Sequence, residues 1–150
     1  KEFSRIMSLK DGTKKMSKSE ISDQSRINLS DEKDQIVNKI KKAKTDPLPM
    51  PFEIKDLDNR PEVRNLLGIY SSLTEASLEK SINEFSGKNF SDFKNTLTQV
   101  LVDKISPLAV EIKKLLNDKN YIDKILSDGA QKADEIASKK IKKIHEIIGF

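Results

Sequence analysis

Apolar residues recur at helical spacing through most of the chain after residue 30, whereas the first 30 residues show no such period. In that first region, the apolar run 5–9 is compatible with the end of a strand, and the polar stretch 10–20 predicts a loop. No segment after residue 30 alternates between apolar and polar positions as a half-buried strand does. The pattern therefore predicts an all-α region over residues 31–150, preceded by a different kind of structure over residues 1–30.

The first three predicted helices have recognisable start and stop signals. Ser30 or Asp31 can cap the first helix, which ends before a connector with prolines at alternate positions. Pro61 is a favourable first residue for the second helix, and Thr74 can cap the third, which ends at Gly87. Their apolar stripes are Ile36, Val37, Ile40 and Ala43 in the first, Val63, Leu66, Leu67, Tyr70 and Leu73 in the second, and Ile82 and Phe85 in the third.

Further helical segments are predicted after residue 90. Ser91 opens a long helix that Pro107 kinks or divides. A short helix that contains Tyr121 ends near residues 128–129, and the last helix runs from there to Gly149. Short connections between such helices favour antiparallel neighbours, so the expected fold of this region is a helical bundle.

The composition narrows the chemistry that the chain can carry. Apolar residues and charged residues each make up 35% of the sequence, which predicts a thin core and a heavily charged surface. There is no cysteine and one histidine, so disulfides, thiolate zinc sites, cysteine nucleophiles and sites with several histidines are excluded. The net charge of +4 permits an anionic partner without requiring one.

The sequence contains no apolar stretch of the roughly 20 residues that a membrane-spanning helix needs. Residues 1–4 lack the hydrophobic core of a signal peptide and do not begin with methionine. These features predict a portion of a longer soluble, cytoplasmic protein.

The polar stretch 10–20 contains the one sharp chemical signal. Lys15 and Lys18 stand three residues apart with Met16 and Ser17 between them, and Ser19 follows. Two ammonium groups on flexible stems at this spacing can bind a polyphosphate and stabilise the charge that develops when phosphate is displaced. A solvated lysine-rich loop is the alternative reading of the same residues.

This stretch resembles a family signature. The sequence Lys-Met-Ser-Lys-Ser over residues 15–19 is that of class I aminoacyl-tRNA synthetases, and the wider run 5–19 resembles the bacterial-type tryptophanyl-tRNA synthetases. The usual proline after Asp11 is replaced by Gly12, which predicts a more flexible entry to the loop. The resemblance continues in collinear blocks to the end of the chain: Ile40-Lys41-Lys42-Ala43 with Thr45-Asp46, Arg60-Pro61-Glu62-Val63 with Asn65-Leu66-Leu67 and Ile69-Tyr70-Ser71, Asp92-Phe93-Lys94, Gly129-Ala130 with Lys132-Ala133, and Gly149-Phe150.

The resemblance implies roles for a few residues. Lys15 and Lys18 would be catalytic, contacting the phosphates of ATP and the departing pyrophosphate. The nucleotide-binding set would be Ile6, which lines the adenine pocket, together with Lys15, Met16, Ser17, Lys18 and Ser19. Residues 1–30 would be the end of a Rossmann-type catalytic domain, and residues 31–150 the helical anticodon-binding domain. No residue-level anticodon contact and no protein-bound metal site is implied.

The resemblance also implies the activity of a parent protein. Such a ligase activates L-tryptophan with ATP and Mg²⁺ to tryptophanyl-adenylate and transfers it to tRNA(Trp), as a cytoplasmic homodimer without a membrane or DNA partner. This chain lacks the His-x-Gly-His signature that the family needs, so it resembles the C-terminal portion and is expected to be inactive alone. A non-enzymatic basic helical module that binds RNA or another protein is the alternative.

Three other features have simpler interpretations. His145 is expected on a helix surface rather than as a catalytic base, and Tyr70 and Tyr121 are expected to pack in the core rather than stack on bases. A basic helix face is expected to be solvated, with contact to a tRNA backbone as the alternative. That face consists of Glu135, Lys139, Lys140, Lys142 and Lys143.

Overall fold

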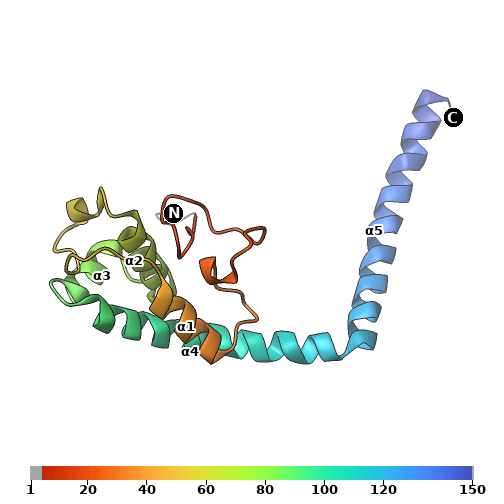
Figure 1. Ribbon diagram of the computed structural model, residues 1–150. Helices are drawn as coiled ribbons and strands as arrows, with labels where there is room; N and C mark the ends of the chain where they lie inside the picture. The colour runs from red at the N-terminus through yellow and green to blue at the C-terminus, as the bar shows by residue number, and fades with distance from the viewer. Residues whose placement is uncertain (1–4, 150) are drawn as a thin grey trace. The chain divides into compact units, whose positions relative to one another are not determined.

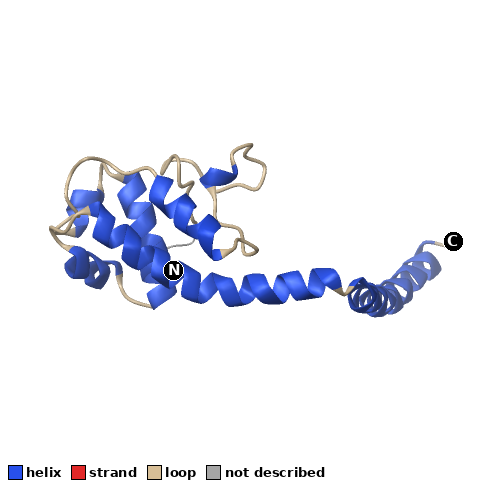
Figure 2. Cartoon of the chain, turned by 60° about the horizontal axis from the view of Figure 1, so that its bottom comes forward, coloured by secondary structure: helices blue, strands red, loops and turns tan. Residues whose placement is uncertain are grey.

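The computed structural model describes residues 5–149 (Figures 1 and 2). Residues 1–4 and Phe150, which closes the last family block, lie outside the described residues. Helices dominate the described part, and its only pairing of extended backbone is an isolated antiparallel bridge between Met7 and Lys15. The chain divides at residue 110 into two units, each of which is described by itself. The predicted all-α class of the region after residue 30 is confirmed.

Helix α1 (Lys33–Lys42) begins at a different cap from the two that the sequence predicted. Glu32 is the N-cap and forms a capping box with Gln35, whose side chain accepts the Glu32 N–H at 2.8 Å. Asp31 was a wrong prediction as a cap because its carboxylate is buried and bound to Lys39 instead. Ile36 and Ile40 are fully buried, while Val37, which was expected on the same face, is 39% exposed.

Helices α2 (Pro61–Thr74) and α3 (Leu78–Phe85) pack against each other. Pro61 occupies the first turn of α2, as predicted. Thr74 was wrong as the cap of α3: it is the last residue of α2, and the left-handed backbone of Glu75 ends that helix. Ser77 caps α3 instead, because it is the residue with extended backbone whose hydroxyl accepts the N–H of Lys80 at 3.2 Å.

The core of the first unit is formed where α1, α2, α3 and the first half of α4 meet. Three aromatic rings pack edge to face at its centre, with centroids 5.0 Å apart for Tyr70 and Phe85 and 4.9 Å apart for Phe85 and Phe93. Tyr70 is therefore a packing residue, as predicted, and its hydroxyl donates to Glu84 at 3.0 Å. The hydroxyls of Ser71 and Ser81 pair across α2 and α3 at 2.8 Å, which satisfies two buried polar groups.

Helix α4 (Phe90–Asn117) is one continuous helix. It starts one residue before Ser91, because Asn89 accepts the N–H of Asp92 at 2.9 Å and so caps the first turn. Of the two alternatives predicted at Pro107, a kink or a division, the division is wrong, because the helix continues through the proline. A helix can tolerate an internal proline at a cost of about 3 kcal/mol, and 28 residues supply enough other hydrogen bonds and apolar contacts to meet it. Buried side chains along α4 stop at Ala109.

Helix α5 (Lys119–Ile148) makes up most of the second unit. It runs without a break through Gly129, so the two helices predicted here are one. A single internal glycine costs only about 1 kcal/mol relative to alanine, which the surrounding helix formers outweigh. No residue of α5 is buried, and Tyr121, which was expected to pack in a core, is 49% exposed.

Candidate functional site

The lysine-containing loop is built on the bridge between Met7 and Lys15. The N–H of Ser8 donates to the carbonyl of Lys14 at 2.8 Å, and the N–H of Met16 donates to the carbonyl of Ile6 at 3.0 Å. Within the run 5–9, Met7 is thus paired as extended backbone, and apart from Lys15 in the bridge the segment 10–20 is a loop of turns and bends, as the sequence predicted.

The turn between the two bridged segments is organised by Asp11. Its carboxylate accepts the hydroxyl of Thr13 at 2.6 Å and the N–H of Thr13 at 3.1 Å, and it pairs with Lys14 at 3.1 Å. These hydrogen bonds, those from Thr13 above all, lower the pKa of Asp11 to about 2 by favouring its charged form. The ammonium group of Lys14 is thus engaged within the turn.

Lys15 and Lys18 have a different environment from Lys14. Both side chains are exposed, and within residues 5–149 neither ammonium group forms an ion pair. Ser17 and Ser19 lie between and beside them, and the N–H of Ser19 donates to the Ser17 hydroxyl at 3.2 Å. This arrangement leaves two positive charges available to an anionic ligand.

The two apolar residues of the predicted nucleotide-binding set lie on the protein side of the loop. Ile6 and Met16 are half-buried, pack against the core of the first unit and are joined by a backbone hydrogen bond. The loop therefore presents lysines to solvent while its apolar side chains anchor it.

The chain that follows the loop is fixed by a buried ion-pair cluster that sequence reasoning missed. Lys39 of α1 is only 2% exposed, and its ammonium group lies 2.6 Å from Asp31 and 2.7 Å from Asp23. The hydrogen bond from Lys39, followed by one from Asn28, lowers the pKa of Asp23. Arg26 also pairs with Asp23 and donates to the carbonyl of Glu20 at 2.9 Å. The far end of the loop is thereby tied to α1.

Helix α2 contacts the loop at two points, which the sequence reasoning also missed. The side-chain amide of Asn65 accepts the Met7 N–H and donates to the Met7 carbonyl, both at 2.9 Å. A Cβ atom on Gly12 would lie 2.5 Å from backbone atoms of Pro61 and Glu62. Gly12 therefore lets the loop backbone lie close to the first turn of α2, in addition to any flexibility that it gives the loop. The signal available in the sequence was a polar residue, Asn65, next to the apolar stripe of α2.

A groove of about 720 Å³ lies between α1 and α4, away from the loop. Its lining includes Lys33, Lys41, Phe90 and Lys94. Burial lowers the pKa of Lys94, whose ammonium group donates to the Ala43 carbonyl at 2.6 Å and so binds the negative end of α1.

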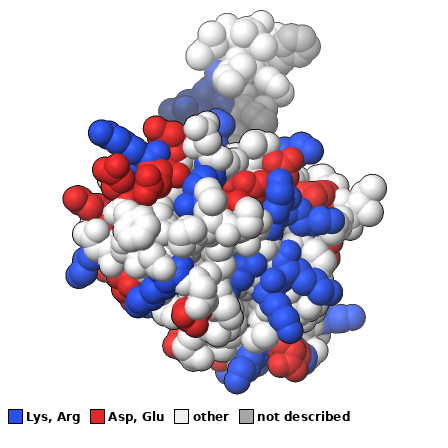
Figure 3. All heavy atoms as spheres, turned by 60° about the vertical axis from the view of Figure 1, so that its left-hand side comes forward, with Lys and Arg blue, Asp and Glu red and all other residues white. Residues whose placement is uncertain are grey.

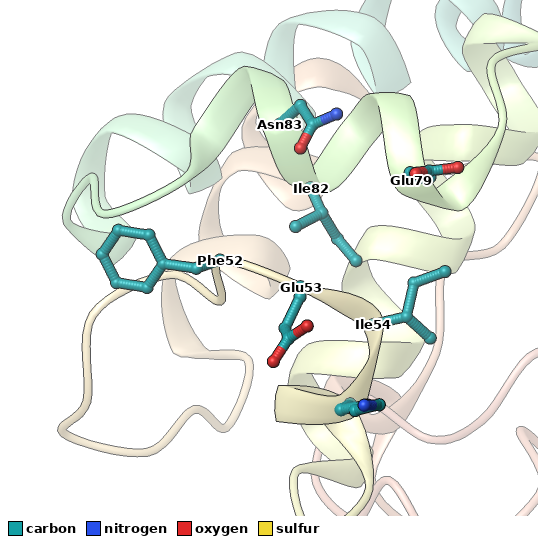
Figure 4. Close-up of a pocket in the computed structure, with 7 residues that line it drawn as sticks. Phe52, Glu53, Ile54, Glu79, Ile82 and Asn83 are labelled. Carbon is teal, nitrogen blue, oxygen red and sulfur yellow. The ribbon is translucent and has the colours of Figure 1, made fainter.

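A smaller pocket of about 240 Å³ lies between α3 and the connector that precedes α2. Figure 4 shows Phe52 and Ile54 of the connector beside Glu79, Ile82 and Asn83 of α3.

On the face drawn in Figure 3, Lys and Arg are interspersed with Asp and Glu. The predicted basic face of α5 and His145 are exposed, so His145 lies on a helix surface as expected. Among residues 5–149, no group of three or more His, Asp or Glu side chains is placed to hold a metal ion, and no helix combines the length and apolarity that a bilayer crossing requires.

The fold and loop together define a class of protein. The profile of the family described as class I tRNA synthetases (W and Y) matches residues 3–106, and the chain belongs to this family. The Lys-Met-Ser-Lys-Ser loop and most of the first unit lie inside the matched region. The family resemblance inferred from the sequence is confirmed.

Individual relatives narrow the class further. The chain is 50% identical over 146 residues to the tryptophan–tRNA ligase of Agrobacterium fabrum and 51% identical over 146 residues to that of Rickettsia felis. These alignments cover 97% of this chain but 41% and 44% of the two relatives, so the chain spans less than half the length of either protein. The relatives do not favour the alternative of a non-enzymatic module.

Solved structures show the same likeness. Tryptophanyl-tRNA synthetase from Mycoplasma pneumoniae superposes with a TM-score of 0.73 at 29% identity, covering 97% of this chain and 44% of that one. The enzyme from Campylobacter jejuni gives a TM-score of 0.68 at 25% identity, covering 99% of this chain and 44% of that one. The helical arrangement described above is thus shared with two synthetases.

Proposed function

We propose that this chain is the C-terminal portion of a tryptophan–tRNA ligase, and that Lys15 and Lys18 bind the phosphates of ATP. One observation carries the proposal: two exposed lysines without ion-pair partners among the described residues stand on a loop with the family signature. Their neighbour Lys14 is held by Asp11. The proposed substrates, tryptophan and its tRNA, are taken from the names of the two relatives.

In the proposed reaction, the carboxylate of L-tryptophan attacks the α-phosphorus of ATP. The bond from that phosphorus to the bridging oxygen breaks, and pyrophosphate leaves with Mg²⁺. Negative charge grows on the leaving group, and the ammonium groups of Lys15 and Lys18 stabilise it. Because this charge is greatest in the transition state, the two lysines raise the rate more than they tighten substrate binding. A terminal hydroxyl of tRNA(Trp) then attacks the carbonyl carbon of tryptophanyl-adenylate, the bond from that carbon to the phosphate oxygen breaks, and AMP leaves.

The remaining assignments follow from the same proposal. Residues 1–30 end the catalytic domain, and residues 31–150 form the anticodon-binding domain. Ile6 lines the adenine pocket, while Met16, Ser17 and Ser19 belong to the nucleotide-binding loop. The intact ligase works as a homodimer in the cytoplasm, with ATP, Mg²⁺, L-tryptophan and tRNA(Trp) as its ligands. The chain alone is inactive, because its single histidine cannot supply the His-x-Gly-His signature.

The test is single-turnover formation of tryptophanyl-adenylate by the intact ligase at saturating ATP. Lys15→Ala and Lys18→Ala should each lower the rate constant about 10²–10³-fold and leave the Michaelis constant for tryptophan nearly unchanged. Lys14→Ala is the matched control, since Lys14 stands beside Lys15 but pairs with Asp11. A loss under about threefold in both test variants would return Lys15 and Lys18 to a solvated loop.

A further inference from the structure

The N–H and C=O groups of Met7 point away from Lys15, the residue with which Met7 is paired in the bridge. The hydrogen bonds of the bridge are made by the flanking residues, from Ser8 to Lys14 and from Met16 to Ile6. In an antiparallel pair of this type, the N–H and C=O of the two central residues point outward, away from each other. The outer edge of Met7 therefore needs a partner from elsewhere in the protein.

Asn65 of α2 supplies that partner. Its amide accepts the Met7 N–H and donates to the Met7 C=O, both at 2.9 Å, as a peptide group of a third strand would. The Asn65 residue is 7% exposed, and its neighbours Leu66 and Leu67 are buried in the core. Because that core fixes α2, the amide presents a rigid edge to the loop.

A second set of contacts holds the same half of the loop. Gly12 approaches the first turn of α2 so closely that a Cβ atom there would collide with the backbone of Pro61. The N–H of Lys44 donates to the Leu9 carbonyl at 2.8 Å, and the Lys44 ammonium pairs with Glu62 of α2 at 2.8 Å. The segment from Met7 to Met16 is thus attached to the helical core.

The other half of the loop lacks such attachments among the described residues. Between Ser17 and Ser19, the loop bonds to itself, through the hydrogen bond from the Ser19 N–H to the Ser17 hydroxyl. Lys15 lies on the attached bridge, whereas Lys18 lies on this unattached part. The two lysines of the signature therefore differ in how firmly the protein places them.

We propose that Asn65 is a positioning residue: it fixes Lys15 relative to the helical core and leaves Lys18 free to move. The part of this inference that concerns rates rests on the proposed function of the two lysines. The structural part does not, because the hydrogen bonds of Asn65 can be tested without substrate.

The structural test is amide hydrogen exchange on this chain with Asn65→Ala. The amides of Met7, Ser8 and Met16 should exchange at least about tenfold faster, since their pairing loosens, while the Leu97 amide in the core reports global opening. Asn83→Ala, an exposed asparagine on α3, is the matched control and should change none of them. Unchanged exchange at Met7 and Met16 would overturn the inference.

A variant of the same size covers the case in which Asn65→Ala opens the whole fold. Asn65→Asp keeps the acceptor for the Met7 N–H and loses the donor to the Met7 carbonyl. It should speed exchange at Met16 with no change at Leu97. Equal acceleration at both amides, or none at either, would contradict a local role for Asn65.

The functional test is a double-mutant cycle in the intact ligase. Asn65→Ala should lower the adenylation rate constant about 10–100-fold without raising the Michaelis constant for tryptophan, since Lys15 is displaced rather than removed. Asn65→Ala should cost nothing further once Lys15 is alanine, but should multiply with the loss from Lys18→Ala. Equal coupling to both lysines, or to neither, would overturn the inference.

The two proposals fail in different ways. If Lys15→Ala leaves the adenylation rate unchanged, the proposed role of the loop is wrong, and the exchange result still decides whether Asn65 holds the bridge. If Lys15→Ala slows adenylation and Asn65→Ala acts independently of it, only the positioning role is wrong.

Discussion

Replacing Lys39 by methionine should destabilise the first unit strongly. Methionine fills much of the space of the lysine stem but leaves Asp31 buried, with a side chain only 4% exposed, and without its cation. Breaking a buried pair by removing one partner typically costs about 3–5 kcal/mol. Asn28 still donates two hydrogen bonds to Asp31, at 2.9 Å and 3.1 Å, so the lower end of that range is expected.

The measurement is urea unfolding of the chain, followed by circular dichroism. A loss of about 3 kcal/mol should also lower the melting temperature by about 10 °C or more. Lys41→Met, at an exposed position on the same helix, is the matched control and should lose little. Lys39→Met with Asp31→Asn should recover part of the loss, because no unpaired buried charge remains. A loss under about 1 kcal/mol for Lys39→Met would refute the reasoning.

The pH dependence gives a second signature of the same cluster. The hydrogen bond from Lys39 holds the pKa of Asp23 below its ordinary value in the folded chain. A depressed carboxyl pKa contributes stability above the unfolded pKa and loses it as the pH falls through the folded pKa. The unmodified chain should therefore lose stability below about pH 4, and Lys39→Met should show a shallower decline. Parallel declines in the two proteins would count against the assignment.

The chain alone should show no tryptophan-dependent pyrophosphate exchange, and exchange above a contamination control would contradict its being only a portion of the ligase. Residues 31–150 should bind tRNA weakly at low salt and lose that affinity at high salt, because lysine-to-phosphate contacts release counterions; absence of binding at low salt would contradict this. Burial and Glu84 raise the pKa of Tyr70 to about 12, so its phenol should contribute stability that is complete below pH 10 and lost towards pH 12. The titration is followed by absorbance in the Tyr121→Phe variant, in which Tyr70 is the one remaining tyrosine. An absorbance midpoint near 10 would be inconsistent with the buried phenol. Gly12→Ala should lower the melting temperature of the chain, and an unchanged value would argue against close packing on Pro61.

The helices of the first unit were predictable because their apolar stripes are built from residues that must be buried. Leu66, Leu67 and Phe93 recur at helical spacing and all lie in the core. Helix caps were less predictable, since several serines, threonines and acidic residues stand near each start and only backbone geometry selects among them. Thr74 failed for this reason, because the chain turns left-handed at Glu75 before α3 begins.

The second unit shows what periodicity cannot decide. Gly129 follows an aspartate and looks like a stop signal, yet α5 continues through it, since a helix interrupted only by one glycine loses little. Tyr121 lies at core-like spacing and is exposed, because the period of a stripe indicates a face and not whether anything covers that face.

Of the candidate site, the exposed lysines were predictable from the sequence, but the contacts that hold their loop were not. Lys15 and Lys18 could be found as candidates from their spacing, because the signature over residues 15–19 is a local motif. The partners that hold the loop come from elsewhere: Asn65 is 58 residues from Met7 along the chain, and Lys39 reaches back to Asp23 and Asp31. Contacts of this kind depend on tertiary packing, which one sequence does not reveal.

The most direct test of the central claim separates the two steps of the proposed reaction. Lys15→Ala and Lys18→Ala in the intact ligase should slow adenylate formation about 10²–10³-fold, because pyrophosphate leaves in that step. Transfer from preformed tryptophanyl-adenylate to tRNA(Trp), measured in a single turnover, should change by less than about threefold, because no pyrophosphate takes part. Equal losses in both steps, or no loss in adenylate formation, would contradict the assignment of these lysines to the departing pyrophosphate.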